Sequence, residues 1–140
     1  MKIAIITDTH FGARNDSVQF DEYFYQFYEG LFFPYLQKHN IKTVIHLGDV
    51  LDRRKFVSYR IAKNFRERFI LPFQALDIEL HALVGNHDIF YKNTNDVNSL
   101  QELINDRYKK IHLYPEAQEV IFDGLPILFM PWINSQNYVY

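Results

Sequence analysis

Three short apolar runs, each followed directly by a cluster of polar residues, set the strongest limit on the fold of this chain. The runs cover residues 3–7, 43–47 and 79–84, a length typical of buried strands. Two longer segments between them have helical spacing, one from Asp16 or Ser17 to about His39 and one from Ser58 to about Phe69. Short apolar strands that alternate with helices predict an α/β fold, with a mostly parallel sheet flanked by helices.

The remaining elements predicted from the sequence are smaller. Residues 97–104 predict a short helix, a further strand follows, and residues 120–122 and 127–130 flank Asp123-Gly124, which predicts a C-terminal hairpin. Pro34 predicts a kink in, or the end of, the first long helix, and Pro72 predicts a break after the second. Residues 1–140 amount to about one domain.

Composition narrows the class of protein. The chain is 48% hydrophobic, as expected for a globular protein with a core, and its net charge of −2 excludes the global basic field of a nucleic-acid coat protein. The absence of cysteine excludes disulfides and thiolate metal sites. The N-terminus lacks a signal-peptide pattern, and no apolar run approaches the roughly 20 residues that span a bilayer. We therefore expect a cytoplasmic protein with no membrane partner.

The polar clusters that follow the three predicted strands carry the chemistry. They are Asp8-Thr9-His10, Gly48-Asp49-Val50-Leu51-Asp52-Arg53 and Gly85-Asn86-His87-Asp88. Each cluster alone also fits a turn or a helix cap. However, the carboxyl ends of parallel strands meet at one edge, where open α/β sheets bind ligands, so we expect the clusters to converge. Carboxylate, imidazole and amide oxygen suit manganese, iron or zinc, and two such ions about 4 Å apart clamp a phosphoryl group and activate water.

In this order and spacing, the clusters resemble the first three motifs of the calcineurin-like metallophosphoesterases. The resemblance covers most of the chain and implies two divalent metal ions, with Mn²⁺ as the expected metal. It implies that Asp8 and His10 bind one ion, that Asp49 bridges both ions, and that Asn86 binds the second.

The same resemblance implies three catalytic residues. His87 would face the substrate, where it would stabilise the transition state or protonate the leaving oxygen, and Asp52 could orient it. Arg53 could meet phosphate, because guanidinium is a good bidentate phosphate partner.

The later motifs of the superfamily are a lone His and a Gly-His-x-His, and this chain contains no Gly-His pair. The other histidines lie at a helix end or within predicted strands, where we expect them to be structural or exposed: His39, His46, His81 and His112. We therefore expect an incomplete site that binds metal weakly or binds one ion, with little or no catalysis. The chain is expected to be the N-terminal part of a longer metallophosphoesterase domain.

Within the superfamily, residues 1–12 and the segment Phe129–Ile133 resemble the SbcD-like double-strand-break repair nuclease subunits, especially the phage recombination endonuclease subunits. This resemblance implies a manganese-dependent DNA exonuclease and endonuclease in repair or recombination. It also implies a homodimer and a coiled-coil ATPase partner.

A basic segment from Arg53 to Arg68 fits a DNA substrate, with seven basic residues against one acid. Phosphate contacts would position a duplex without reading its sequence. The candidate contacts are Arg54, Lys55, Arg60 and Lys63. A solvated helix face explains the same segment equally well.

The first long helix is unusually aromatic. Phe20, Phe24, Phe27 and Leu31 share one face at helical spacing, and core packing is the favoured explanation for the three Phe residues. The additional Tyr and Phe residues of this helix also fit a subunit interface, where aromatic side chains are enriched.

Two other functions stay open from the sequence. The first is a phosphatase or nucleotide phosphodiesterase of the same superfamily, because Gly48–Arg53 also resembles the second motif of protein phosphatases. Those enzymes usually carry Gly after that Arg and Glu at the end of the third motif, where this chain has Arg54 and Asp88. The second is a non-catalytic dimerisation or assembly module.

Overall fold

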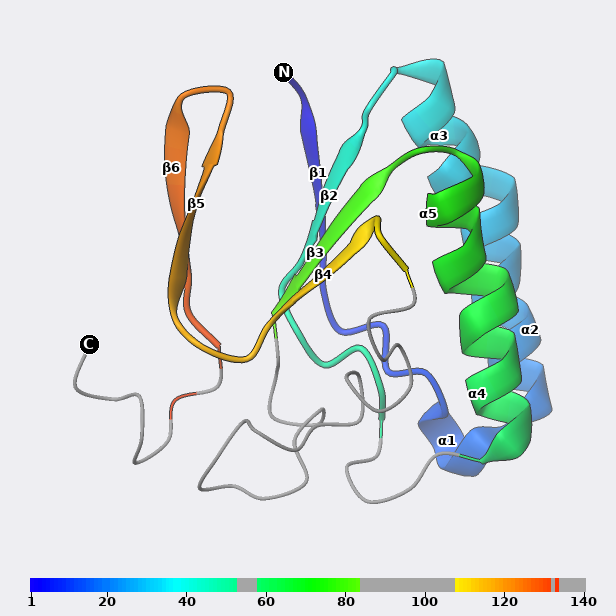
Figure 1. Cartoon of the computed structure of the whole chain (residues 1–140). Coiled ribbons are helices and arrows are strands. Elements are labelled where there is room, and N and C mark those ends of the chain that lie inside the picture. Colours follow the sequence, from blue (N-terminus) through cyan, green and yellow to red (C-terminus); the bar gives the residue numbers. More distant parts are fainter. Residues whose placement is uncertain (53–57, 84–107, 132, 134–140) are drawn as a thin grey trace.

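A four-stranded parallel sheet forms the centre of the computed structural model, which describes residues 1–52, 58–83, 108–131 and 133. Its order is β1-β2-β3-β4, and the strands are β1 (Ile3–Ile6), β2 (Thr43–His46), β3 (Glu79–Leu83) and β4 (Ile111–Tyr114). The helices cover one face of the sheet, and a hairpin lies on the other side (Figure 1). The predicted α/β class is confirmed, while the helix predicted at residues 97–104 lies outside the described residues.

The helical layer begins with a short helix, α1 (Ala13–Asp16), followed by a longer helical rod. This rod consists of α2 (Val18–Phe27), a π-helical turn η1 (Tyr28–Phe32) and α3 (Phe33–Lys38). Ser17 caps it, because its hydroxyl accepts a hydrogen bond from the Phe20 amide at 3.4 Å. The predicted start at Ser17 is therefore confirmed.

The second rod has the same construction. It consists of α4 (Tyr59–Phe65), a π-helical turn η2 (Arg66–Ile70) and α5 (Leu71–Ala75), and the Ser58 hydroxyl caps it by accepting from the Ile61 amide at 3.2 Å. The predicted break at Pro72 is wrong, and Pro34 does not end the first rod. Proline lacks an amide donor and displaces the carbonyl four residues earlier, and in both rods that carbonyl lies in the π turn, where the wider turn accommodates the ring.

The main hydrophobic core lies between the sheet and the two rods. Phe65, Phe69 and Phe73 of the second rod pack against aromatic residues of the first and against Val44 and Leu80 of the sheet. The buried aromatic residues of the first rod are Tyr28, Phe32 and Phe33.

The prediction that core packing explains Phe20, Phe24 and Phe27 is wrong. These side chains are 37%, 38% and 44% exposed, Leu31 is 57% exposed, and α2 has no buried residue. Aromatic residues occur on almost every side of this rod, so the 3.6-residue period does not select one face. The π turn then rotates the later residues, and the sheet packs against those.

A smaller core lies between the sheet and the hairpin of β5 (Gln118–Phe122) and β6 (Leu125–Phe129). It contains Ile45 and Tyr114 from the sheet and Phe122 and Phe129 from the hairpin. Asp123 and Gly124 form the two-residue turn, with φ angles of 51° and 84°, and left-handed residues at both positions match the twist of the strands. The predicted hairpin is thus confirmed.

None of the helices in the described parts of the chain has both the length and the apolar character needed to cross a membrane.

Candidate metal centre

The loops that follow β1 and β2 run side by side beyond the ends of the strands. The Asp8 amide donates to the Gly48 carbonyl at 3.1 Å, and the His10 amide donates to the Asp49 carbonyl at 3.0 Å. Further along, the Phe11 amide donates to the Val50 carbonyl at 2.8 Å. Parallel pairing therefore continues past the sheet edge and holds the polar clusters after β1 and β2 in register.

Apolar residues of the same loops anchor them to the core. The Phe11 ring lies 5.0 Å from the ring of Phe65 and 5.1 Å from that of Phe69, while Val50 and Leu51 are 2% and 0% exposed. Because these residues occupy the interior, the polar side chains between them are directed away from it.

Three of the four predicted metal ligands come together at this edge. Asp8, His10 and Asp49 each offer one ligand atom, and these atoms all lie within 4.8 Å of one another. The Nε2 atom of His10 lies 3.2 Å from Oδ1 of Asp8. Two carboxylates and one imidazole form a donor set that fits a divalent ion such as manganese, iron or zinc. The fourth predicted ligand, Asn86, lies outside the described residues.

The surroundings of Asp8 keep its carboxylate in the ionised form that a metal requires. The Thr7 hydroxyl donates to Asp8 Oδ2 at 2.6 Å, and this bond, assisted by His10, holds the pKa of Asp8 below its ordinary value. A negative oxygen is thus available at Asp8 well below neutral pH.

Asp52 lies beside His10. Its Oδ1 atom is 3.5 Å from Nδ1 of His10, on the side of the imidazole away from Asp8. The predicted partner of Asp52, His87, lies outside the described residues, as do Arg53, Arg54 and Lys55. The proximity of Asp52 to His10 was not predicted from the sequence.

A buried histidine connects the two loops to β2. Nδ1 of His46 accepts a hydrogen bond from the Gly48 amide at 3.1 Å, so Nε2 carries the proton and donates to the Thr9 hydroxyl at 3.0 Å. That hydroxyl donates to the Val50 carbonyl at 3.0 Å. Burial lowers the pKa of His46 to about 4, so the ring is neutral at pH 7. The structural role predicted for His46 is confirmed, whereas no signal in the sequence pointed to Thr9.

The two described residues of the predicted phosphate-binding set lie on α4. Nη1 of Arg60 is 3.5 Å from Oδ2 of Asp21, and Lys63 is exposed. On η2, Arg68 pairs with Glu22 at 2.8 Å. Part of the basic segment therefore joins the two helical rods, and DNA contact by Arg60 and Lys63 stays a prediction.

A hollow of about 650 Å³ lies next to the candidate metal centre, between the end of β1 and α2. Asp8 and Thr9 line one part of it, and Tyr23, Phe24 and Phe27 line another. The exposed aromatic residues of α2 are therefore neighbours of a predicted metal ligand.

Comparison with known proteins identifies the family. Residues 1–137 match the family model described as calcineurin-like phosphoesterase. This chain belongs to the calcineurin-like phosphoesterase family. Its members use divalent metal ions, and the converging Asp8, His10 and Asp49 are a donor set that fits such ions. The family assignment made from the three motifs is thus confirmed.

One relative of this calcineurin-like phosphoesterase is the protein named exonuclease subunit 1 of Enterobacteria phage T4. The two sequences are 33% identical over 144 residues, which cover 98% of this chain and 40% of the phage protein. The chain therefore spans about two fifths of the length of this relative.

Proposed function

We propose that this chain contributes to the two-metal site of a DNA nuclease subunit, with exonuclease and endonuclease activity in DNA repair or recombination. The observation that carries the proposal is the convergence of Asp8, His10 and Asp49 within 4.8 Å at the carboxyl edge of the sheet. Membership of the phosphoesterase family supports hydrolysis of a phosphoester as the reaction. The name of the phage relative supports nucleic acid as the substrate.

The proposal gives each residue a role. Asp8 and His10 would hold one ion, Asp49 would contact both ions, and Asn86 would bind the second. The ions, when bound, polarise the phosphoryl group and lower the pKa of water. Asp52 stands on the far side of the His10 ring from Asp8, a position from which it orients this ligand.

Three catalytic assignments rest on the resemblance to the family. Asp52 orients His87, His87 acts on the leaving oxygen, and Arg53 contacts phosphate. Because Asp52 lies 3.5 Å from His10 Nδ1, its carboxylate is close enough to serve the metal ligand as well.

Calorimetric titration of Mn²⁺ into the chain tests the metal site. We expect saturable binding that Asp49→Asn weakens at least tenfold, because losing even an outer partner of a ligand costs roughly 10–100-fold in metal affinity. Asn86→Ala should weaken it as well. Asp123→Asn is the matched control, since this carboxylate lies in the hairpin turn and pairs with the N-terminus. Binding that Asp49→Asn leaves unchanged would overturn the ligand assignment.

Fluorescence anisotropy with a labelled DNA duplex tests the substrate class. The Mn²⁺-loaded chain should bind the duplex in preference to a phosphoserine peptide, and Asp49→Asn should reduce binding. Hydrolysis of both substrates is followed in parallel. Hydrolysis of the peptide without duplex binding would instead favour a phosphatase, and the absence of both metal and DNA binding would favour an assembly module.

Lys63 provides a specific test of DNA contact. Removing one phosphate contact lowers the slope of log K against log salt concentration by about 1. We expect this change for Lys63→Ala and no change for Lys38→Ala, an exposed lysine near the end of α3. Equal slopes for the two variants would remove Lys63 from the interface.

We also propose that two copies of the chain associate through the exposed side of the first rod, here called the aromatic face. It consists of Phe20, Tyr23, Phe24, Phe27 and Leu31, which are 37–70% exposed. Exposed apolar patches mark interaction sites, and aromatic residues are enriched in subunit interfaces. A coiled-coil ATPase partner and action in the cytoplasm complete the proposal on the basis of the family resemblance.

A further inference from the structure

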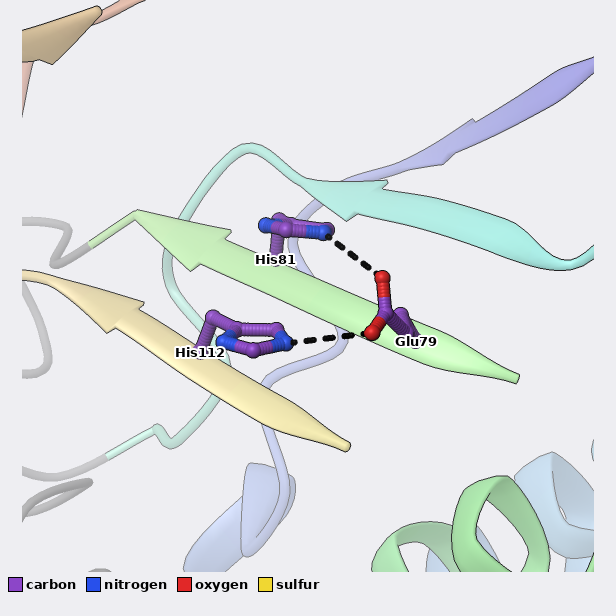
Figure 2. Close-up of side chains that lie close together, drawn as sticks. All are labelled: Glu79, His81 and His112. Carbon is purple, nitrogen blue, oxygen red and sulfur yellow. Dashed lines mark ion pairs between the residues drawn. The ribbon is translucent and has the colours of Figure 1, made fainter. Parts of the chain in front are cut away.

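Two histidines and a glutamate form a second polar cluster away from the candidate metal centre. Glu79 and His81 belong to β3, and His112 lies opposite His81 in the register of β4. Figure 2 shows the two imidazole rings side by side, each with a nitrogen facing the Glu79 carboxylate. The rings are stacked, with centroids 4.6 Å apart and an angle of 16° between their planes. Glu79 begins β3, so the cluster starts at the opposite end of the sheet from the predicted metal ligands.

The two nitrogens that face Glu79 have no hydrogen-bond partner among the described residues. Nε2 of His81 and Nε2 of His112 are both buried. His81 as a whole is only 5% exposed. A buried polar atom without a hydrogen bond costs about 1–3 kcal/mol, so this arrangement requires an explanation.

The spacing of the three side chains fits a shared metal ion better than direct hydrogen bonds. Nε2 of His81 is 3.8 Å from Glu79 Oε2, and Nε2 of His112 is 3.7 Å from Glu79 Oε1. Both distances exceed the roughly 2.7–3.2 Å of an N–H···O hydrogen bond. Ligand atoms bound tetrahedrally at about 2.1 Å lie roughly 3.4 Å apart, so small side-chain movements would complete a site. One ligand atom from each residue already lies within 4.8 Å of the others.

The far side of the His81 ring has the partner that a metal ligand usually has. Nδ1 of His81 lies 2.6 Å from the Tyr114 hydroxyl, and both groups are buried. A proton on Nδ1 donated to Tyr114 leaves the Nε2 lone pair directed at Glu79, as in metal sites where the second ring nitrogen donates to an outer partner.

We infer that Glu79, His81 and His112 form a second metal site, which takes a divalent transition ion of the Zn²⁺ type. Two imidazoles and one carboxylate are a known donor set for zinc, with a fourth position left for water or another ligand. The side chains of His112 and Glu79 are 38% and 45% exposed, which gives an ion access from solvent. The ion would link β3 to β4 on the side of the sheet where the hairpin packs. This inference does not depend on the proposed nuclease function.

Zn²⁺ titration in an Asp49→Asn background tests the second site, because this substitution weakens the candidate metal centre. We expect one equivalent of Zn²⁺ to bind the whole chain, and both His112→Gln and Glu79→Gln to weaken it at least tenfold. His39→Gln is the matched control, since His39 follows the last residue of α3 and its ring lies 4.2 Å from that of Tyr35. Co²⁺ bound in place of Zn²⁺ has a visible absorption spectrum that reports nitrogen and oxygen ligands. His112→Gln should abolish this absorption.

Two results would overturn the inference. One is the absence of Zn²⁺ binding in the Asp49→Asn chain, and the other is binding that neither His112→Gln nor Glu79→Gln weakens. The substituted side chains are partly exposed, and circular dichroism verifies that each variant is folded. A Mn²⁺ site that requires Asp49 would survive either result, so failure here leaves the proposed nuclease function standing.

Discussion

The predicted metal ligands share an unusual backbone conformation. Asp8, His10 and Asp49 have φ angles of 56°, 44° and 54°. Side chains other than glycine pay roughly 1–2 kcal/mol in the left-handed region, and such residues cluster at functional sites. The hydrogen bonds from the Asp8 and His10 amides to the neighbouring loop offset this cost. The ligand atoms of these three residues lie within 4.8 Å of one another.

Removing the hydroxyl of Thr9 should loosen this arrangement. Thr9→Val leaves the Nε2 proton of His46 without its acceptor and removes one of the donors to the Val50 carbonyl, so we expect a loss of about 1–3 kcal/mol in the free energy of unfolding. Mn²⁺ affinity should fall too, because Thr9 lies between two predicted ligands. Urea denaturation without metal and calorimetry measure the two effects. Thr9→Ser keeps the hydroxyl and should lose less of both, so equal losses would contradict this explanation.

His46 makes stability depend on pH. Its pKa is about 4 in the folded chain and about 6.5 when unfolded, so the unfolded state binds the extra proton between these values. Stability is therefore complete above pH 6.5 and is lost as pH falls towards 4. Asp8 opposes the pKa shift, and His10 reinforces it.

Urea denaturation at pH 7 and pH 5, in metal-free buffer, measures this dependence. At about 1.4 kcal/mol per pKa unit, the His46 contribution to the loss is about 2 kcal/mol. His46→Gln should remove the His46 contribution to this loss of stability. The similar contribution of His81, whose pKa is also about 4, should remain. An unchanged difference between the two pH values in the variant would contradict the assignment.

The sequence predicts the converging ligands but not the residues that support them. Asp8 and Asp49 follow apolar runs that were predicted to be strands of a mostly parallel sheet, whose carboxyl ends meet at one edge, and the structure shows that the two strands are neighbours. The bond between Thr9 and His46 joins residues 37 positions apart, and neither residue type nor spacing marks it. The position of Asp52 beside His10 likewise depends on the path of two loops.

At the scale of elements, both helical rods accommodate a proline by means of a π turn. Each has a π turn directly before a helix whose second residue is proline, Pro34 in one rod and Pro72 in the other. Local composition marks a proline as a helix breaker, so the continuation of the second rod through Pro72 was not predicted, whereas the first helix was expected to reach about His39. The strands and the hairpin were predictable because their apolar runs and the Asp123-Gly124 turn are local signals.

Replacing Gly30 or Gly124 with alanine should change the free energy of unfolding in opposite directions. Gly30 lies in η1 with open space where an added methyl group would point, so Gly30→Ala should raise the free energy of unfolding by about 0.5–1 kcal/mol. Gly124 also has open space, but its φ of 84° favours glycine, so Gly124→Ala should lower stability by about 1 kcal/mol. Denaturant titration of both variants measures the pair, and the same sign for both would contradict this account of the two backbones.

At the scale of the whole molecule, the main core packs directly against the loop that carries the predicted metal ligands. Phe11 follows His10 directly, and its ring packs on Phe65 and Phe69, which belong to the second rod. Helix packing therefore reaches the loop after β1 through Phe11, while Val50 and Leu51 join the loop after β2 to the same core. The first rod contributes Tyr28 to the same contact, with its ring centroid 5.7 Å from that of Phe11. The residues of the aromatic face on the same rod are exposed, and the Phe27 ring lies 5.3 Å from that of Tyr28.

The aromatic face should hold two copies of the chain together. We expect sedimentation velocity to show association that increases with protein concentration, and Tyr23→Glu with Phe27→Glu to shift the population to monomer. These side chains are 70% and 44% exposed, so the loss of unfolding free energy should stay within about 1 kcal/mol. Leu128→Glu, at a site 62% exposed in the hairpin, is the matched control and should leave association intact. Monomer at every concentration, or equal dissociation by the control, would exclude this face as the interface.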